Sequence, residues 1–345
     1  MKRNLTAGLI LLLSFTCQAD YWIQRADFAG LSRADAAGFS IGTKGYLGTG
    51  FTGTYASDWW EYDTATDAWT QKAGIPGGSG YVETGWFSIG NKGYLLSFPG
   101  GTDFWEYDPS LNTWTLKAPF PGPVRQACVT FVANNKGYVT TGSSSTMAAS
   151  LNDLWQYDPA LNTWTQKSDL PAAVRHYACG FGIGSKGYVG TGVSPTSGLL
   201  SDFWEYNSTT DTWSALPAFP GGARIEATAF SIGNKGYMGM GSGGGIYHFD
   251  FYQFDPATNT WIQKADFGGG PREEAVQFSI GSSGYVGTGY NGIASGVMTN
   301  DFWEYRSEDN PSALSEINNP ATNSPFRKRS GANPPASPAT YSRLR

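Results

Sequence analysis

The chain has little of what most metal sites and many catalytic sites need. Among 345 residues it has only two histidines, His176 and His248, and three cysteines, and charged residues make up only 15%. A metal site built on histidines needs more of them close together. The sequence contains no phosphate-binding loop and no His-Glu-x-x-His. We therefore expect no metal and no cofactor.

Residues that favour helices are also scarce, whereas glycine and aromatic residues are abundant: 46 Gly, 13 Trp, 19 Tyr and 20 Phe. This composition predicts an all-β protein. A hydrophobic share of 40% excludes wholesale disorder. The net charge of −5 gives no support to a nucleic-acid partner.

The first 19 residues have the pattern of a secretory signal. Lys2 and Arg3 precede an apolar run from Ala7 to Phe15, and small residues follow at Cys17 and Ala19. The run is shorter than the roughly 20 residues that span a bilayer. The alternative is a lipoprotein anchored through Cys17. We expect cleavage after Ala19, no transmembrane segment, and a periplasmic or extracellular protein.

Residues 306–345 are rich in Ser, Pro and Asn, a composition that predicts a disordered tail. Deletion of this tail should leave the melting temperature unchanged. Of the 23 basic residues, two lie before residue 20 and six after residue 305, whereas three of the 28 acidic residues lie after residue 305. Residues 20–305 therefore carry a net charge of −10. We expect this part to be a monomer.

A repeat with a period of 44 to 50 residues fills residues 20–305. Lys-Gly-Tyr ends at Tyr46, Tyr94, Tyr138, Tyr188 and Tyr237, and Ser-Gly-Tyr ends at Tyr285. An Asp-x-Trp-x-Tyr-Asp segment or a close variant follows each, and a Trp comes six residues after its last position in five units. Each unit predicts four short antiparallel strands. This number of strands and this repeat length are typical of one blade of a β-propeller.

The last unit stops after its third strand, at Tyr305. The segment Trp22 to Phe28 copies Trp261 to Phe267 nearly residue for residue. We therefore predict six blades, with the N-terminal strand completing the last blade and closing the ring. Removing Tyr21 to Phe28 should lower the free energy of unfolding by several kcal/mol, because the buried Trp and the hydrogen bonds of the strand ladder are lost.

These features resemble the kelch-repeat propellers, whose hallmark is a glycine-rich second strand followed by spaced Tyr and Trp. The resemblance covers roughly residues 22–305. The sequence departs from it in detail, since Gly-x-Gly stands for the usual double Gly and Tyr252 stands for the third-strand Trp in the fifth unit. Galactose oxidase is similar in its propeller, but the residues of its copper site are missing here.

Cys128 and Cys179 remain after signal cleavage. Counted back from Phe131 and Phe181 they lie three and two residues away, so alternation along a strand points them to opposite faces. We predict two free thiols.

Loop length indicates which face carries function. The segments joining the second strand to the third vary from seven residues (51–57) to ten (143–152) and eleven (290–300), whereas the turns on the opposite face are short and nearly invariant. Variation among otherwise similar repeats is typical of a binding face.

A charged pattern begins on the same face. Arginine stands six residues before the Phe of each first strand in five units, with Tyr81 in the second unit, and an acid follows two residues later in four of the six units. We hypothesise two stacked rings at the channel mouth. The candidate ligand-binding residues are Arg33, Asp35, Glu83, Arg125, Arg175, His176, Arg224, Glu226, Arg272 and Glu274. The alternative, which we favour, is that Arg ties the loops together and the acids neutralise it.

Two functions remain open. The first is a binding or interaction module for a glycan or protein ligand at the variable-loop face. The second is an enzyme, because exported six-bladed kelch propellers include the sialic acid mutarotases. That resemblance implies a general acid and base plus a cation for the substrate carboxylate, supplied by Arg224 with Glu226, Arg272 with Glu274, or His176.

Overall fold

The computed structural model describes residues 20–77, 82–97, 101–144, 149–292 and 296–307, all within one compact unit. The signal and tail predictions lie outside these residues, apart from positions 306 and 307. The described residues form β-strands and no helix. These residues therefore contain no helix that is long and apolar enough to cross a membrane.

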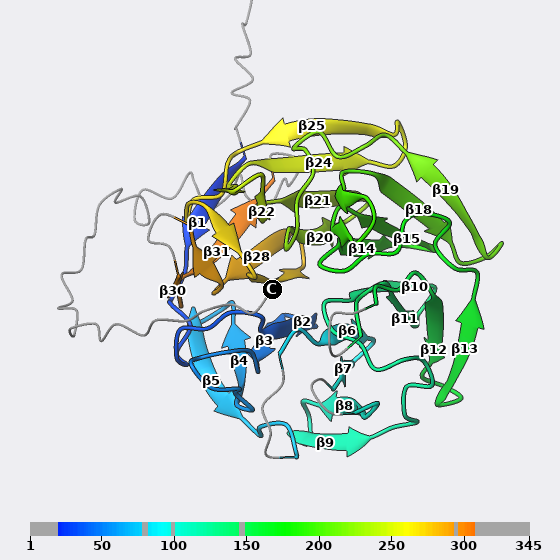
Figure 1. Cartoon of the computed structure of the whole chain (residues 1–345). Coiled ribbons are helices and arrows are strands. Elements are labelled where there is room, and N and C mark those ends of the chain that lie inside the picture. Colours follow the sequence, from blue (N-terminus) through cyan, green and yellow to red (C-terminus); the bar gives the residue numbers. More distant parts are fainter. Residues whose placement is uncertain (1–19, 78–81, 98–100, 145–148, 293–295, 308–345) are drawn as a thin grey trace, which may run out of the picture. The chain divides into compact units, whose positions relative to one another are not determined.

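Six four-stranded antiparallel sheets make up the fold (Figure 1). In sheet order the strands are β2 (Ala37–Ile41), β3 (Lys44–Gly48), β4 (Trp59–Asp63) and β5 (Ala68–Lys72); β6 (Gly85–Ile89), β7 (Lys92–Leu96), β8 (Phe104–Asp108) and β9 (Thr113–Leu116); β10 (Val129–Ala133), β11 (Lys136–Thr140), β12 (Leu154–Asp158) and β13 (Thr163–Lys167); β14 (Cys179–Ile183), β15 (Lys186–Gly190), β18 (Phe203–Asn207) and β19 (Thr212–Leu216); β20 (Thr228–Ile232), β21 (Lys235–Gly239), β24 (Phe251–Asp255) and β25 (Thr260–Lys264); and β27 (Val276–Ile280), β28 (Ser283–Gly287), β31 (Phe302–Arg306) and β1 (Tyr21–Gln24).

The first strands of the sheets, β2, β6, β10, β14, β20 and β27, are the inner strands (Figure 1). Each contacts the inner strand of the next sheet along the chain, and β27 contacts β2. The all-β architecture is consistent with the predicted propeller.

The glycine of Lys-Gly-Tyr lets neighbouring sheets approach closely. A Cβ on Gly93 would lie 1.9 Å from the Phe39 ring, and one on Gly236 would lie 1.9 Å from the Phe181 ring. The same contact recurs between Phe278 of the sixth sheet and Gly45 of the first, at 2.4 Å. The repeated Phe and Gly are therefore two halves of one packing contact between sheets.

The repeated Trp of each fourth strand also binds the preceding sheet. Trp69 Nε1 donates to the Ala26 carbonyl, and Trp114 Nε1 donates to the Ala73 carbonyl. Trp22 of β1 makes the same bond to the Ala265 carbonyl at 3.1 Å, and β1 pairs with β31 over four residues. The N-terminal segment thus occupies the fourth-strand position of the sixth sheet.

The variable segments contain short strands that the sequence analysis treated as loops. These are β16 (Val193–Ser194), β17 (Gly198–Leu199), β22 (Ser242–Gly243), β23 (Ile246–Tyr247), β26 (Arg272–Glu273), β29 (Tyr290–Asn291) and β30 (Val297–Met298). Glycines at positive φ, such as Gly198 and Gly245, allow the tight turns. The prediction of free thiols at Cys128 and Cys179 is confirmed.

Candidate functional site

The five arginines of the predicted ring are buried in ion pairs. Each guanidinium binds the aspartate that precedes the third strand of its own unit, and its Nη1 also donates to a backbone carbonyl near the end of the second strand. The pairs are Arg33–Asp58, Arg125–Asp153, Arg175–Asp202, Arg224–Asp250 and Arg272–Asp301. No arginine of the five is more than 2% exposed. They hold loops together and offer no guanidinium to a ligand.

The structure corrects two details of the stacked-ring hypothesis. The neutralising acids are the third-strand aspartates, not the acids two residues away. The arginines and those acids also do not share a side, because Asp35 and its equivalents have a left-handed backbone, with φ of 54° at Asp35 and 56° at Glu226. The rule that residues two apart face the same way holds only for an extended strand.

The acids instead belong to a ring of six equivalent positions, which we call the mouth ring. Its members all have φ between 50° and 56° and are Asp35, Glu83, Ala127, Tyr177, Glu226 and Glu274. Backbone hydrogen bonds join neighbouring members, as from Tyr177 N to the Ala127 carbonyl and from Glu226 N to the Tyr177 carbonyl. Positive φ is uncommon for such residues, and its repetition reflects the fold. Tyr81, before the ring in the second unit, lies outside the described residues.

The mouth ring surrounds a cavity of about 120 Å³, which we call the mouth cavity. All six ring members line it, together with the small residues that follow five of them and Trp86, Gln277 and Thr84. No lysine, arginine or histidine of the described residues lines it. A larger cavity of about 310 Å³, lined by residues of the inner strands, shares Thr84 and Cys128 with it. Four of the residues that line the mouth cavity are therefore acidic, namely Asp35, Glu83, Glu226 and Glu274.

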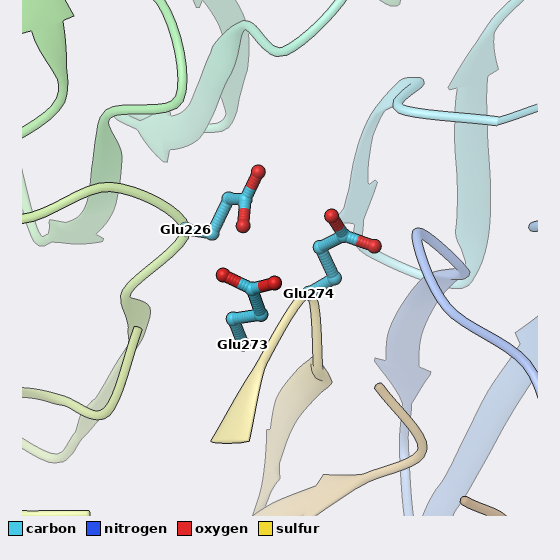
Figure 2. Close-up of side chains that lie close together, drawn as sticks. All are labelled: Glu226, Glu273 and Glu274. Carbon is cyan, nitrogen blue, oxygen red and sulfur yellow. The ribbon is translucent and has the colours of Figure 1, made fainter. Parts of the chain in front are cut away.

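Three carboxylates lie close together, those of Glu226, Glu273 and Glu274 (Figure 2), and of these Glu226 and Glu274 line the mouth cavity. Oxygens of Glu226, Glu273 and Glu274 lie within 4.8 Å of one another. Burial, followed by the charges of Glu274 and Glu273 and a hydrogen bond with Glu273, raises the pKa of Glu226 well above its ordinary value. A hydrogen bond between two carboxyl groups requires a proton on one of them, and the raised pKa favours Glu226 as the group that holds it. The Oε2 atom of Glu226 is buried and has no hydrogen-bond partner.

Glu273 was not among the predicted site residues. It lies one residue from Glu274, and strict alternation would place it on the opposite face of the strand. It is only 4% exposed, in the two-residue strand β26, which pairs with β29. Only the left-handed turn at Glu274 brings the two carboxylates together. On the other side of the cavity, the Tyr177 hydroxyl donates to Glu83 Oε1 at 2.9 Å.

His176 does not join this group. Its Nδ1 lies 2.8 Å from the Ser150 hydroxyl, and it does not line the mouth cavity. Burial lowers its pKa, so the ring is neutral at pH 7 and is no cation for a carboxylate ligand.

We expect Glu226→Gln to melt at a higher temperature than the wild type at pH 8. Between the ordinary and the raised pKa, the native state holds a proton that the unfolded chain does not. This stabilisation is complete below the ordinary pKa and is lost as the pH rises through the raised one. Glutamine keeps the shape and never ionises. Thermal melts at pH 5 and pH 8 should show the difference growing with pH.

Asp266→Asn, at an exposed carboxyl, serves as the control and should show no such growth. A Glu226→Gln protein that melts below the wild type at pH 8 would contradict the crowding of carboxylates described above.

Exposed apolar side chains gather on the face that carries the mouth ring. Of the ten large hydrophobic residues that are exposed in the described part of the chain, six lie in segments joining second to third strands or one sheet to the next. These are Leu31, Tyr55, Leu199, Ile246, Phe249 and Val297. Hairpins β16–β17, β22–β23 and β29–β30, with Phe249, form what we call the hairpin crown.

The hairpin crown begins next to the mouth ring. Ile225, adjacent to Glu226, pairs with Ser242 of β22, and Glu273 pairs with Tyr290 of β29. The two hairpins also touch, since a Cβ on Gly292 would lie 2.3 Å from Tyr247 Cβ. Two hairpins of the crown, β22–β23 and β29–β30, thus pair directly with the residues next to Glu226 and Glu274.

No family model matches the chain, and no curated protein matches it. Among solved structures, the chain is similar to one titled "Structure of YjhT", with a TM-score of 0.69 and 18% sequence identity over 80% of this chain and 95% of that one. At this identity the likeness supports the fold class, an all-β architecture consistent with a propeller, and nothing finer.

Proposed function

We propose that the protein is an exported six-bladed kelch-type β-propeller, closed by its N-terminal strand, that acts as a binding module. Pairing of β1 with β31, the bond from Trp22 and contact of β27 with β2 support the ring closure. The observation that carries the function is the joining of the hairpin crown to an acidic cavity on the variable-loop face. Exposed apolar residues grouped beside buried polar ones are typical of interaction surfaces.

A protein ligand fits this surface better than a glycan. The exposed side chains of the hairpin crown are mostly aliphatic: Leu199, Ile246 and Val297 are 38%, 61% and 53% exposed. Aliphatic groups suit apolar side chains of a partner protein, whereas aromatic rings are the more effective partners for planar or cationic groups.

A sialic acid mutarotase is the second candidate. Glu226, whose pKa is raised, and the neighbouring Glu274 supply a candidate acid and base at a cavity. The cation for the substrate carboxylate is missing, however, because Arg224 and Arg272 are engaged by Asp250 and Asp301. We expect no faster anomer exchange of N-acetylneuraminate by NMR than in buffer. Acceleration that Glu226→Gln abolishes would reverse this preference.

The binding function is tested with panels of exported proteins and glycans probed with the purified chain. We expect a protein ligand whose affinity falls at least tenfold in Ile246→Ser/Phe249→Ser, because hot-spot side chains at the centre of an interface carry most of the binding free energy. Leu111→Ser/Leu161→Ser is the matched control, since these leucines are 69% and 70% exposed in the turns between third and fourth strands.

Equal loss in both variants would contradict a specific surface. A glycan ligand with no dependence on Ile246 would instead favour the glycan alternative. No ligand in either panel, from a normally folded protein, would overturn the proposal.

A further inference from the structure

We propose that the second unit binds the guanidinium group of an arginine side chain from the protein partner. The site consists of Ser97, Asp103 and Trp105, which we call the guanidinium cradle. This inference rests on the proposed function, because it names one chemical group of the partner. It starts from a comparison of the six units: five of them hold an arginine of their own against the aspartate that precedes the third strand, and the second unit has no arginine there.

The complete form of the site recurs in four units. The two Nη atoms of the arginine bind both oxygens of the aspartate, and a backbone carbonyl accepts a further bond from Nη1. A tryptophan two residues after the aspartate donates to the same carboxylate. In the first unit Trp60 Nε1 donates to Asp58 Oδ2 at 2.8 Å. The same bond is made by Trp155, Trp204 and Trp303.

The second unit keeps the frame of this site. Ser97 N donates to the Asp103 carbonyl at 2.9 Å, as Thr49 N does to the Asp58 carbonyl at 3.1 Å. The backbone that carries the aspartate is therefore held in the same way in both units. Trp105 follows two residues after Asp103, at the position of the donating tryptophan. Only the arginine differs.

Two polar groups of the cradle have no partner among the described residues. Asp103 is exposed and its carboxylate makes no ion pair within that part of the chain, whereas its five equivalents are partly buried and paired. Trp105 Nε1 is buried without a hydrogen-bond partner. Buried N–H groups are nearly always paired. A guanidinium bound to Asp103 would hold the carboxylate where, in four other units, it also accepts from the tryptophan, so one ligand would satisfy both groups.

The chain does not supply this guanidinium from the segment that supplies it in the other units. Tyr81 stands at the arginine position, and residues 73–91 contain no lysine or arginine. A phenol has one O–H donor and no charge, so it does not replace the five N–H donors of arginine. The segment from Ser97 to Asp103 is also short. It has five residues (98–102), whereas the other units have from eight (50–57) to twelve (289–300), and this agrees with the exposure of Asp103.

The geometry favours arginine over lysine. The sibling sites bind a planar fork, with two parallel N–H···O bonds to one carboxylate, and a lysine ammonium cannot form this pair. The cradle lies on the face that carries the hairpin crown, because Asp103 ends a segment that joins a second strand to a third. A protein resting on that face can therefore reach the cradle with a side chain.

The test uses the full chain labelled with ¹⁵N and a probe that isolates the side chain, Nα-acetyl-L-arginine methylamide. We expect the probe to shift the indole N–H resonance of Trp105, which is identified by its loss in Trp105→Phe. The citrulline analogue, which is neutral and has nearly the same shape, should bind at least fivefold more weakly. The lysine analogue should also bind at least fivefold more weakly. Equal affinity of the three probes would overturn the inference.

Two variants remove the cradle in different ways. Asp103→Asn should lower the affinity for the arginine probe at least tenfold, whereas Asp266→Asn, the matched control at another exposed carboxyl, should stay within twofold of the wild type. Tyr81→Arg restores the repeat and should lower the affinity at least tenfold, because its own guanidinium would fill the cradle. Tyr81→Gln brings no guanidinium and should stay within twofold. Wild-type affinity in folded Asp103→Asn or Tyr81→Arg, checked by circular dichroism, would overturn the inference.

Further results separate this inference from the proposed function. Ile246→Ser/Phe249→Ser should still bind the arginine probe, because its changes lie outside the cradle. A protein partner should lose at least tenfold in affinity for Asp103→Asn. A partner that requires Ile246 but not Asp103 would overturn this inference and leave the proposed function standing. Free L-arginine that binds at least tenfold more tightly than the blocked probe would indicate a small-molecule ligand and overturn the assignment to a partner side chain.

Discussion

Replacing Trp22 with alanine is expected to lower the free energy of unfolding by about 3 kcal/mol, at the lower end of the range for buried Trp. The indole packs against Phe251, Phe267 and Tyr305, with ring centroids 5.2, 4.9 and 5.1 Å away. Its Nε1 also donates to the Ala265 carbonyl. Truncation leaves a cavity and an unpaired carbonyl between the fifth and sixth sheets, and urea denaturation measures the loss.

Gln24→Ala is the control on the same strand, because Gln24 is exposed and pairs with β31 through its backbone. It should change stability by less than about 0.5 kcal/mol. Equal effects of the two substitutions would mean that β1 is a dispensable edge strand, and the proposed ring closure would fall. The companion expectation, that the tail can be deleted without cost, concerns residues outside the described ones and stays a prediction.

The sheets could be predicted because each one is encoded locally. Five copies of Lys-Gly-Tyr, one of Ser-Gly-Tyr and six of the third-strand motif set the strand positions, and the hairpin turns between them have the Gly and Asn that such turns require. The place of β1 was predictable for the same reason, since Trp22 to Phe28 repeats the segment beginning at Trp261. Repetition makes one unit a template for the rest.

The candidate site could be predicted only in part, because it depends on a backbone conformation that cannot be inferred from the residue types at these positions. Asp35, Glu226 and Glu274 adopt positive φ although they are not glycine, and this breaks the alternation on which the facing of side chains was argued. The acids do line one cavity together, whereas Arg33, which was assigned to the same surface, is buried in its ion pair with Asp58. Glu273 escaped notice for the same reason.

The aspartates before the third strands show a second limit. They recur in all six units, but nothing in their spacing identified the arginine 25 to 29 residues earlier as the partner in five of them. The contact between Arg33 and Asp58 is visible only once the first and third strands are folded against each other. A repeated polar residue is thus evidence of a repeated contact, but its partner comes from the fold.

Replacing Arg125 with methionine is expected to cost about 3–5 kcal/mol, the usual loss when one member of a buried ion pair is removed. Arg125 Nη1 and Nη2 bind the two carboxylate oxygens of Asp153 at 2.7 and 2.6 Å, and Nη1 donates to the Thr141 carbonyl at 3.0 Å. The guanidinium also lies 4.9 Å from the centre of the Phe120 ring. Methionine fills much of the volume and satisfies none of the acceptors.

Two comparisons make the result specific. Lys167→Met breaks the more exposed pair with Asp211, whose N–O distance is 3.7 Å, and should cost less than about 1 kcal/mol. Arg125→Met/Asp153→Leu removes both buried charges and should recover part of the single-variant loss, since the penalty comes from the carboxylate left alone. Urea midpoints of the four proteins, wild type included, give these differences.

The same variants decide between a structural arginine and a ligand-binding one. If Arg125 only holds the loops, ligand affinity in the folded Arg125→Met protein should match the wild type at temperatures below its melting transition. Unchanged stability with lost binding would instead return the arginines to the ligand surface.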